Sequence, residues 1–351
     1  MNRISNLQLF SILISVKAFS LICSGITADA GQMAGAAIAI VLQFILALPM
    51  LSLYSRDGFD LKKEMLFGRL GMTFYALFFI MWGAVSFNRL WGVSKSVYFP
   101  VESSLMCSVI IAAVCLYCSS LGFNALSRSS LIMAGIFIFS VGVLILGAYS
   151  KADTANYVPS AAVRTVLENA VSYFCSSGEP VMLFILLNSS RSDRSKGVTA
   201  FFAGALILTE LIYLIEITVL GKIINITDFP FFTAGAFSQP FSIQRADSLY
   251  MITFTLLCVM TVTLQLILAA MLVKEIIPEL KYNTLLSVIL MLSISAFLNY
   301  SGINIFPLIG ILIIILSAVI PVIMLIRRIY NEKKTCGGNN DASAVRMQSQ
   351  N

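Results

Sequence analysis

Ten apolar stretches follow one another along the chain, and short polar connections separate them. A helix that crosses a bilayer needs about 20 mostly apolar residues, which is roughly the length of each stretch. The pattern therefore predicts an all-α polytopic membrane protein with about ten transmembrane helices. The expected spans are residues 7–26, 33–54, 70–90, 105–121, 131–149, 170–187, 198–220, 249–273, 283–300 and 303–326. They form one transmembrane domain over residues 1–330, and the polar residues 331–351 are expected to be a disordered cytoplasmic tail.

Basic residues are spread unevenly over the connections. Of the 23 Lys and Arg residues, sixteen fall on the side of the two chain ends, six fall on the other side, and Lys17 lies inside the first span. Arg89, at the end of the third span, is one of the six. Because basic connections stay in the cytoplasm, both termini are expected to be cytoplasmic. The net charge of +6 is then a consequence of topology and implies no nucleic-acid partner.

Composition argues against membrane-embedded catalysis. The chain is 58% hydrophobic and 11% charged, so the bilayer must act as its solvent. It has no histidine, which removes the commonest metal ligand and general base. Cys115 and Cys118 form a C-x-x-C pattern inside a span and are interpreted as packed thiols. We expect no enzyme activity, no cofactor and no metal site.

Four charged residues lie inside apolar spans: Lys17, Glu179, Glu210 and Glu216. Each costs about 2.5–3.5 kcal/mol near the centre of a bilayer, and such residues usually face a cavity or a partner. Glu179 lies in the segment 176–180, with sequence Ser-Ser-Gly-Glu-Pro, where glycine and proline weaken the helix. A broken helix exposes backbone groups that can bind ions or small ligands. The other interpretation is a proline kink whose carboxylate bonds to a neighbouring helix.

Lys17 and Glu179 lie in the first and sixth spans. In a division of five plus five, these are the first helices of the two halves, where interruptions indicate a transporter binding site. Lys17 is expected to face a cavity; the alternative hypothesis is a closed core in which it pairs with Glu179. Gln43 and Gln265 are expected to form hydrogen bonds between helices.

Several local features resemble one family when their order along the ten spans is considered. They are Gly122 with Ser127-Arg128, Asn156-Tyr157-Val158-Pro159, Gly178-Glu179 followed by residues 181–184, and Arg245-Ala246-Asp247-Ser248. The chain resembles the endospore germination permeases, the B subunits of nutrient germinant receptors, in the amino acid–polyamine–organocation superfamily. This resemblance implies a leucine-transporter-like 5+5 inverted repeat with broken helices 1 and 6. The chain departs from the family at Phe19-Ser20-Leu21, where relatives carry a Gly-x-Gly-like patch.

The resemblance implies a receptor subunit in the spore inner membrane or cell membrane. It would sense a small nutrient such as an amino acid, or sense and transport it, together with A-type and C-type receptor subunits. A ligand carboxylate would meet Lys17 or the backbone near Ser20, and its ammonium would meet Glu179 or carbonyls near Ser176 and Ser177. The expected ligand-binding residues are Lys17, Ser20, Ser176, Ser177, Gly178 and Glu179.

Two further hypotheses stay open. An autonomous proton-coupled amino-acid transporter would use Glu179 or Glu210 as its proton carrier. A membrane anchor for the other receptor subunits would have lost its binding pocket.

Overall fold

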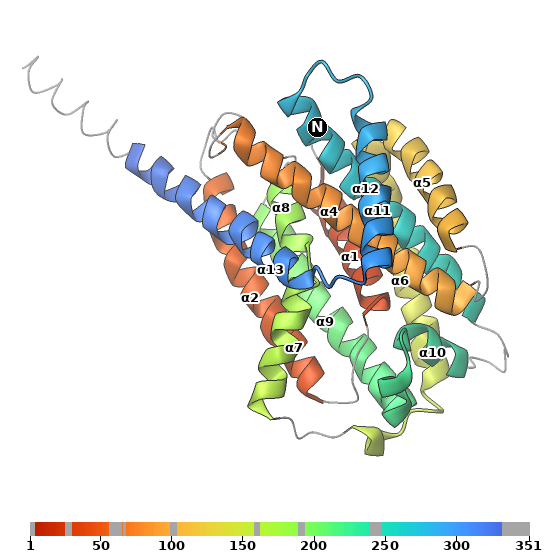
Figure 1. Ribbon diagram of the computed structural model, residues 1–351. Coiled ribbons are helices and arrows are strands. Elements are labelled where there is room, and N and C mark those ends of the chain that lie inside the picture. Colours follow the sequence, from red (N-terminus) through yellow and green to blue (C-terminus); the bar gives the residue numbers. More distant parts are fainter. Residues whose placement is uncertain are drawn as a thin grey trace, which may run out of the picture.

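The computed structural model describes residues 4–24, 30–55, 65, 68–98, 104–157, 162–188, 194–238 and 247–331, and these ranges form a helical bundle (Figure 1). The tail predicted for residues 331–351 lies outside them except for Asn331. The α-helices are α1 (Asn6–Ile22), α2 (Ala30–Ser55), α4 (Arg69–Val93), α5 (Ser104–Ser120), α6 (Phe123–Ala148), α7 (Val163–Cys175), α8 (Glu179–Leu187), α9 (Arg194–Leu220), α10 (Pro230–Phe237), α11 (Asp247–Ile276), α12 (Asn283–Ser301) and α13 (Phe306–Ile314).

The helices account for all ten predicted spans. Within the described residues, seven helices are long and apolar enough to cross a membrane, and α7 with α8 makes an eighth span bent by 43°. Two shorter apolar helices, Asn6–Ile22 and Met106–Ser120, match the first and fourth predicted spans. α13 continues through a π turn, so the tenth span runs from Phe306 to Asn331. The prediction of an all-α polytopic membrane protein is confirmed.

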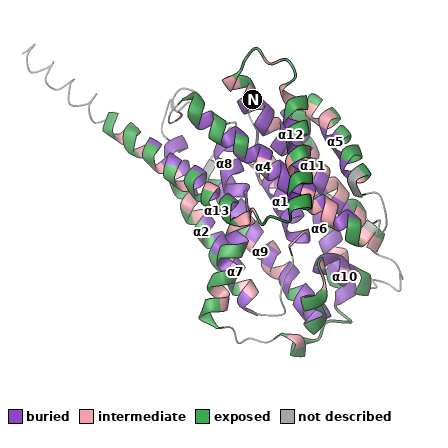
Figure 2. Ribbon diagram, in the orientation of Figure 1, coloured by how far each residue is buried: buried purple, intermediate pink, exposed green. Residues whose placement is uncertain are grey.

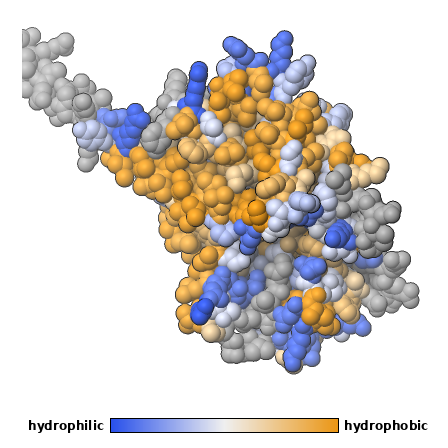
Figure 3. Space-filling model, viewed as in Figure 1, coloured by the Kyte–Doolittle hydropathy of each residue, from blue (hydrophilic) through white to orange (hydrophobic). Residues whose placement is uncertain are grey.

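Apolar side chains cover much of the outer surface of the bundle. Figure 3 shows them over the body of the molecule, with hydrophilic residues gathered toward the two ends. On α2, for example, Ile38, Leu42 and Ile45 are exposed. Such a band faces lipid, because hydrocarbon is as apolar as these side chains.

The interior of the bundle is built around α1, α4 and α11. Every residue of α1 from Ser11 to Ile22 is buried, and the helix packs against α6, α9 and α11 (Figure 2). α4 and α11 pack along each other, and Gln265 on α11 donates a hydrogen bond of 2.9 Å to Ser86 on α4. The interhelical role expected for Gln265 is therefore confirmed. The Nε2 atom of Gln43 has no hydrogen-bond partner among the described residues.

Helix 1 corrects the prediction of a break. α1 is continuous from Asn6 to Ile22, and Ser20 lies inside it. Phe19-Ser20-Leu21 contains neither glycine nor proline, so nothing interrupts the ladder of backbone hydrogen bonds. Seventeen residues extend only about 25 Å, which is less than the hydrocarbon thickness of about 30 Å. The helix is therefore too short to cross the hydrocarbon layer by itself, and residues 25–29 after it lie outside the described ranges.

Helix 6 is broken as predicted. α7 ends at Cys175, α8 begins at Glu179, and Ser176, Ser177 and Gly178 connect them outside any helix. α7 begins at Val163, earlier than expected, and packs along α2. The closeness of this pair depends on Gly35, because a Cβ atom there would lie 2.9 Å from the backbone nitrogen of Ala170.

Candidate functional site

The connection between α7 and α8 is held by its own side chains. The hydroxyls of Ser176 and Ser177 each donate a hydrogen bond of 2.9 Å to the carbonyl of Tyr173, which caps the end of α7. Pro180 has no N–H group, and this suits the first turn of α8. Gly178 packs on the indole of Trp82, since an added Cβ atom would lie 2.6 Å from that ring. The local sequence thus dictates both the break and its contact with α4.

Lys17 and Glu179 meet at this break. The Nζ atom of Lys17 donates a hydrogen bond of 3.0 Å to the Ser177 hydroxyl and lies 3.9 Å from Oε1 of Glu179. It also lies 4.1 Å from the centre of the Tyr173 ring. Both charged side chains are at most 2% exposed. Neither carboxylate oxygen of Glu179 has a hydrogen-bond partner among the described residues. The pair joins α1 to the start of α8.

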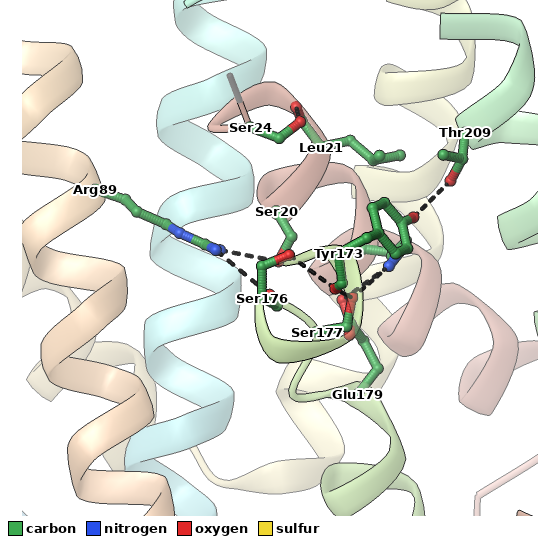
Figure 4. Close-up of polar contacts among 10 residues, drawn as sticks. Ser20, Leu21, Ser24, Arg89, Tyr173, Ser176, Ser177, Glu179 and Thr209 are labelled. Atoms are coloured by element: carbon green, nitrogen blue, oxygen red, sulfur yellow. Dashed lines mark hydrogen bonds and ion pairs between the residues drawn. The ribbon is translucent and has the colours of Figure 1, made fainter. Parts of the chain in front are cut away.

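Arg89 on α4 is a second cation at the break. Its guanidinium donates hydrogen bonds to the Ser20 hydroxyl at 3.2 Å and to the Ser176 carbonyl at 3.4 Å. Figure 4 shows the side chain extending from α4 toward both residues. The guanidinium carbon lies 5.6 Å from the ring centres of both Trp82 and Phe306.

A cavity of about 820 Å³ lies directly beside this arrangement. Its wall includes the C-terminal end of α1, Arg89 on α4, the inner face of α7, Tyr213 on α9 and the connection between α12 and α13. Besides Arg89, the charged residue in the wall is Glu168, which pairs with Arg164 at 2.8 Å near the surface. Nonpolar side chains make up much of the remaining wall, for example Val85, Leu298 and Phe306. Size and lining match a small-molecule pocket.

Of the residues predicted for the site, one lies in the cavity wall and the others lie behind it. Ser176 lines the cavity, whereas Lys17, Ser20, Ser177, Gly178 and Glu179 do not. Lys17 is linked to the wall through Tyr173, and Ser20 through Arg89. The backbone near Ser20 is helical, so its N–H groups are not free to bind a carboxylate. That part of the predicted binding mode is wrong.

Glu210 and Glu216 lie on α9 and form no ion pair with Lys17 among the described residues, although Glu210 acts electrostatically on Tyr173. Glu210 is half-buried and Glu216 is 1% exposed, and neither lines the cavity. The connection between α9 and the break is made by Thr209 instead, whose hydroxyl forms a hydrogen bond of 2.9 Å with the Tyr173 hydroxyl. Among the described residues, no group of three or more His, Cys, Asp and Glu side chains is placed to hold a metal ion.

Arg89 lines the cavity, although the sequence predicts it in an outer connection. That prediction follows from a third apolar span that is expected to end at Leu90. Instead, the membrane-spanning helix runs on to Val97 and places Arg89 within the bundle. The apolar residues Leu90, Trp91 and Val93 indicate in the sequence that the span continues past Arg89.

Comparisons with known proteins agree with this architecture. The family model described as "Spore germination protein" matches residues 3–305. Among solved structures, Mhp1 in an inward facing conformation has a TM-score of 0.59 at 12% sequence identity, covering 90% of this chain and 76% of Mhp1. A second Mhp1 structure is described as a nucleobase-cation-symport-1 family transporter in a closed conformation with bromovinylhydantoin bound. It has a TM-score of 0.49 at 14% identity, covering 89% of this chain and 78% of that one. No curated protein matches the chain in sequence.

Proposed function

Because the chain belongs to the spore germination protein family, we propose that it is the permease-like subunit of a nutrient germinant receptor in the spore inner membrane. Its fold is that of a transporter, and its bundle is that of a multi-pass membrane protein. In this proposal the subunit senses a small nutrient of the amino-acid class, and A-type and C-type receptor subunits bind it in the same membrane. Both termini are cytoplasmic, so the cavity opens to the outer side.

One observation carries the proposal: the cavity of about 820 Å³ ends at the break between α7 and α8. A broken helix and a buried ion pair are expensive inside a membrane, and they are usually kept where a ligand binds. Ser176 belongs to the connection between α7 and α8, and Lys17 on α1 donates a hydrogen bond to Ser177 in the same connection. A ligand that contacts Ser176 therefore acts on a segment that is bonded to α1. Ligand binding can thereby change the relation between α1 and α8, which is what a sensor requires.

A substitution that fills the cavity tests the sensing role. Ser172 lines the cavity, and Ser172→Trp would occupy much of the space beside Ser176. Spores carrying this variant should lose nutrient-triggered loss of refractility while the protein stays in the membrane at its normal amount. Ser120→Trp, at an exposed end of α5, is the matched control and should germinate normally. Normal nutrient response in the Ser172→Trp spores would overturn the proposal.

The receptor assignment requires partners, and co-purification tests it separately. The tagged protein, extracted from spores in mild detergent, should retain A-type and C-type subunits. Recovery of the protein alone from membranes that contain both subunits would contradict the receptor role.

An autonomous proton-coupled transporter is the second candidate. Among the described residues, neither oxygen of the buried Glu179 carboxylate has a hydrogen-bond partner, so the break beside the cavity holds a carboxylate that its surroundings do not hydrogen-bond. Proton-driven uptake of an amino acid by proteoliposomes that contain this protein alone would favour this candidate.

A further inference from the structure

Arg89 is a cation in the cavity wall without an ion pair of its own among the described residues, because it and Lys17 share one carboxylate at the break, Glu179, which acts on Arg89 from a longer distance. Among the described residues, no carboxylate lies within 4.0 Å of its guanidinium, although Lys17 and Arg164 each have one. Its direct contacts are with neutral groups: the Ser20 hydroxyl, the Ser176 carbonyl and two aromatic rings. A charge that is half-buried in a membrane protein calls for a counter-ion. The cavity leaves room for that counter-ion to come from a ligand.

The hydrogen-bonding capacity of Arg89 supports the same conclusion. A guanidinium has about five N–H donors in a planar fork that matches a carboxylate. The structure uses one nitrogen for Ser20 and the other terminal nitrogen for Ser176, the latter at a long 3.4 Å. The remaining donors suffice for a bidentate pair with a ligand carboxylate. Lys17 is less suited, because Ser177 and Glu179 already hold it outside the cavity wall.

Two helix ends give the cavity a region of opposite polarity. α1 ends at Ile22 and α7 ends at Cys175, and the residues that follow them, Cys23 and Ser176, both line the cavity. Several terminal carbonyls already have partners: those of Leu21 and Tyr173 accept hydrogen bonds from serine hydroxyls, and that of Ser176 accepts one from Arg89. Each helix end still carries about half a negative charge, so the two ends together favour cations, of which Arg89 is one and a ligand ammonium would be a second.

From this arrangement we propose that the cavity binds an amino acid with an apolar side chain, and that Arg89 is its carboxylate-binding residue. The ammonium lies toward the C-terminal ends of α1 and α7, and the side chain packs on the apolar wall near Val85, Leu298 and Phe306. This inference rests on the proposed function, since it names the ligand class of the same cavity. It reverses the roles that the sequence suggested, because Lys17 no longer takes the carboxylate.

The test uses ligands that lack one charge at a time. Purified full-length protein in lipid nanodiscs is titrated with L-alanine, L-valine and L-leucine, and with 3-methylbutylamine and 4-methylpentanoate, which are leucine without its carboxylate and without its ammonium. The chain has two tryptophans, so a Trp91→Phe background leaves Trp82 as the fluorescent reporter next to Arg89. We expect at least one of the three amino acids to bind and the amine to bind roughly 10- to 100-fold more weakly than leucine.

Three variants separate the possible outcomes. Arg89→Gln should weaken amino-acid binding roughly 10- to 100-fold and erase the difference between leucine and the amine, whereas Arg89→Lys should restore part of both. Arg128→Gln, at an exposed position on α6, should bind like the parent. Lys17→Met should keep the preference for a carboxylate. Thermal unfolding of each variant verifies that it is folded.

Four results would overturn the inference: no binding of any of the three amino acids, equal binding of leucine and the amine, unchanged binding by folded Arg89→Gln, or loss of the carboxylate preference in Lys17→Met alone. The proposed function fails differently. Amino-acid binding that depends on Arg89, combined with a normal nutrient response of Arg89→Gln spores, would refute the sensing role and leave the binding site standing. Unchanged binding by Arg89→Gln, combined with Ser172→Trp spores that do not respond to nutrient, would refute the role of Arg89 and leave the sensing role standing.

Discussion

Lys17 on α1 and Glu179 at the start of α8 form a buried pair, with Nζ 3.9 Å from Oε1. The separation is longer than that of a good charged hydrogen bond, and Ser177 holds the ammonium at 3.0 Å. The Tyr173 ring lies on a further side of the same ammonium. The lysine thus has three close contacts, whereas the carboxylate has Lys17 as its ion-pair partner, Arg89 as a more distant cation, and no hydrogen-bond donor among the described residues. This asymmetry predicts unequal effects of the two single substitutions.

We expect Lys17→Met to lower the free energy of unfolding by about 3–5 kcal/mol, because it removes the near counter-charge of the buried Glu179 carboxylate and leaves only the more distant Arg89. Glu179→Gln should be milder, since Ser177 and Tyr173 still hold the lysine. The double variant should recover part of the loss, and the coupling energy follows from a double-mutant cycle in mixed micelles with added denaturing detergent. Arg164→Met, which breaks an exposed pair of 2.8 Å, is the control and should change stability by less than about 1 kcal/mol. Strictly additive effects at Lys17 and Glu179 would show that the two charges do not interact.

Gly178 should tolerate no larger residue. A Cβ atom would meet the Trp82 indole at 2.6 Å, so Gly178→Ala must displace either the ring or the connection between α7 and α8. We expect a loss of about 1–3 kcal/mol and a changed tryptophan emission spectrum. Gly135→Ala on α6 is the matched control, because nothing lies within 4 Å of its added Cβ atom. That control should gain up to about 1 kcal/mol from better helix propensity. A Gly178→Ala protein as stable as its parent would contradict this packing.

The native cysteines can report the position and the sidedness of the cavity. Cys23 and Cys175 line it, whereas Cys115 and Cys258 are fully buried. A membrane-impermeant thiol reagent should modify Cys23 and Cys175 in single-cysteine variants but leave Cys115 and Cys258 unmodified. If both termini are cytoplasmic, Cys336 in the C-terminal tail should react only from the opposite side of a sealed vesicle. Reaction of Cys175 and Cys336 from the same side would contradict the predicted orientation.

Much of the fold follows from the sequence because lipid imposes length and composition on every span. The break at Gly178 and Pro180 was also predictable, because two residues that weaken a helix lie beside a carboxylate in an otherwise apolar stretch. The continuity of α1 was obscured by the family resemblance, although Phe19-Ser20-Leu21 contains nothing that would break a helix. Local sequence was the better guide there.

The candidate site was only half predictable. Lys17 and Glu179 attract notice because each interrupts an apolar stretch, but nothing in the sequence says whether they face a ligand or each other. Arg89 was missed for a physical reason: an arginine close to the end of a predicted span is most simply explained as a residue at the membrane surface. Its place in the cavity depends on where α1 ends and α7 breaks, and both are properties of the assembled bundle.

Proton coupling is the property that most clearly separates a sensor from a transporter. Glu179 lies at the break and pairs with Lys17, whereas Glu210 acts from α9 on Tyr173 in the cavity wall, so we expect Glu179 to be the carboxylate that would link a proton to the ligand. We expect proteoliposomes containing this protein alone to bind an apolar amino acid but not to accumulate it when a pH gradient is imposed. Uptake of labelled amino acid, compared with and without a protonophore, measures this.

If such uptake is nevertheless observed, the two carboxylates show how it arises. A transporter coupled through Glu179 would lose accumulation in Glu179→Gln while keeping exchange of labelled for unlabelled amino acid, and Glu210→Gln would transport normally. That pattern would replace the sensing proposal with an autonomous proton-coupled transporter. Exchange survives in that case because it needs a ligand site and a conformational change, whereas accumulation also needs a carboxylate that releases its proton on the far side.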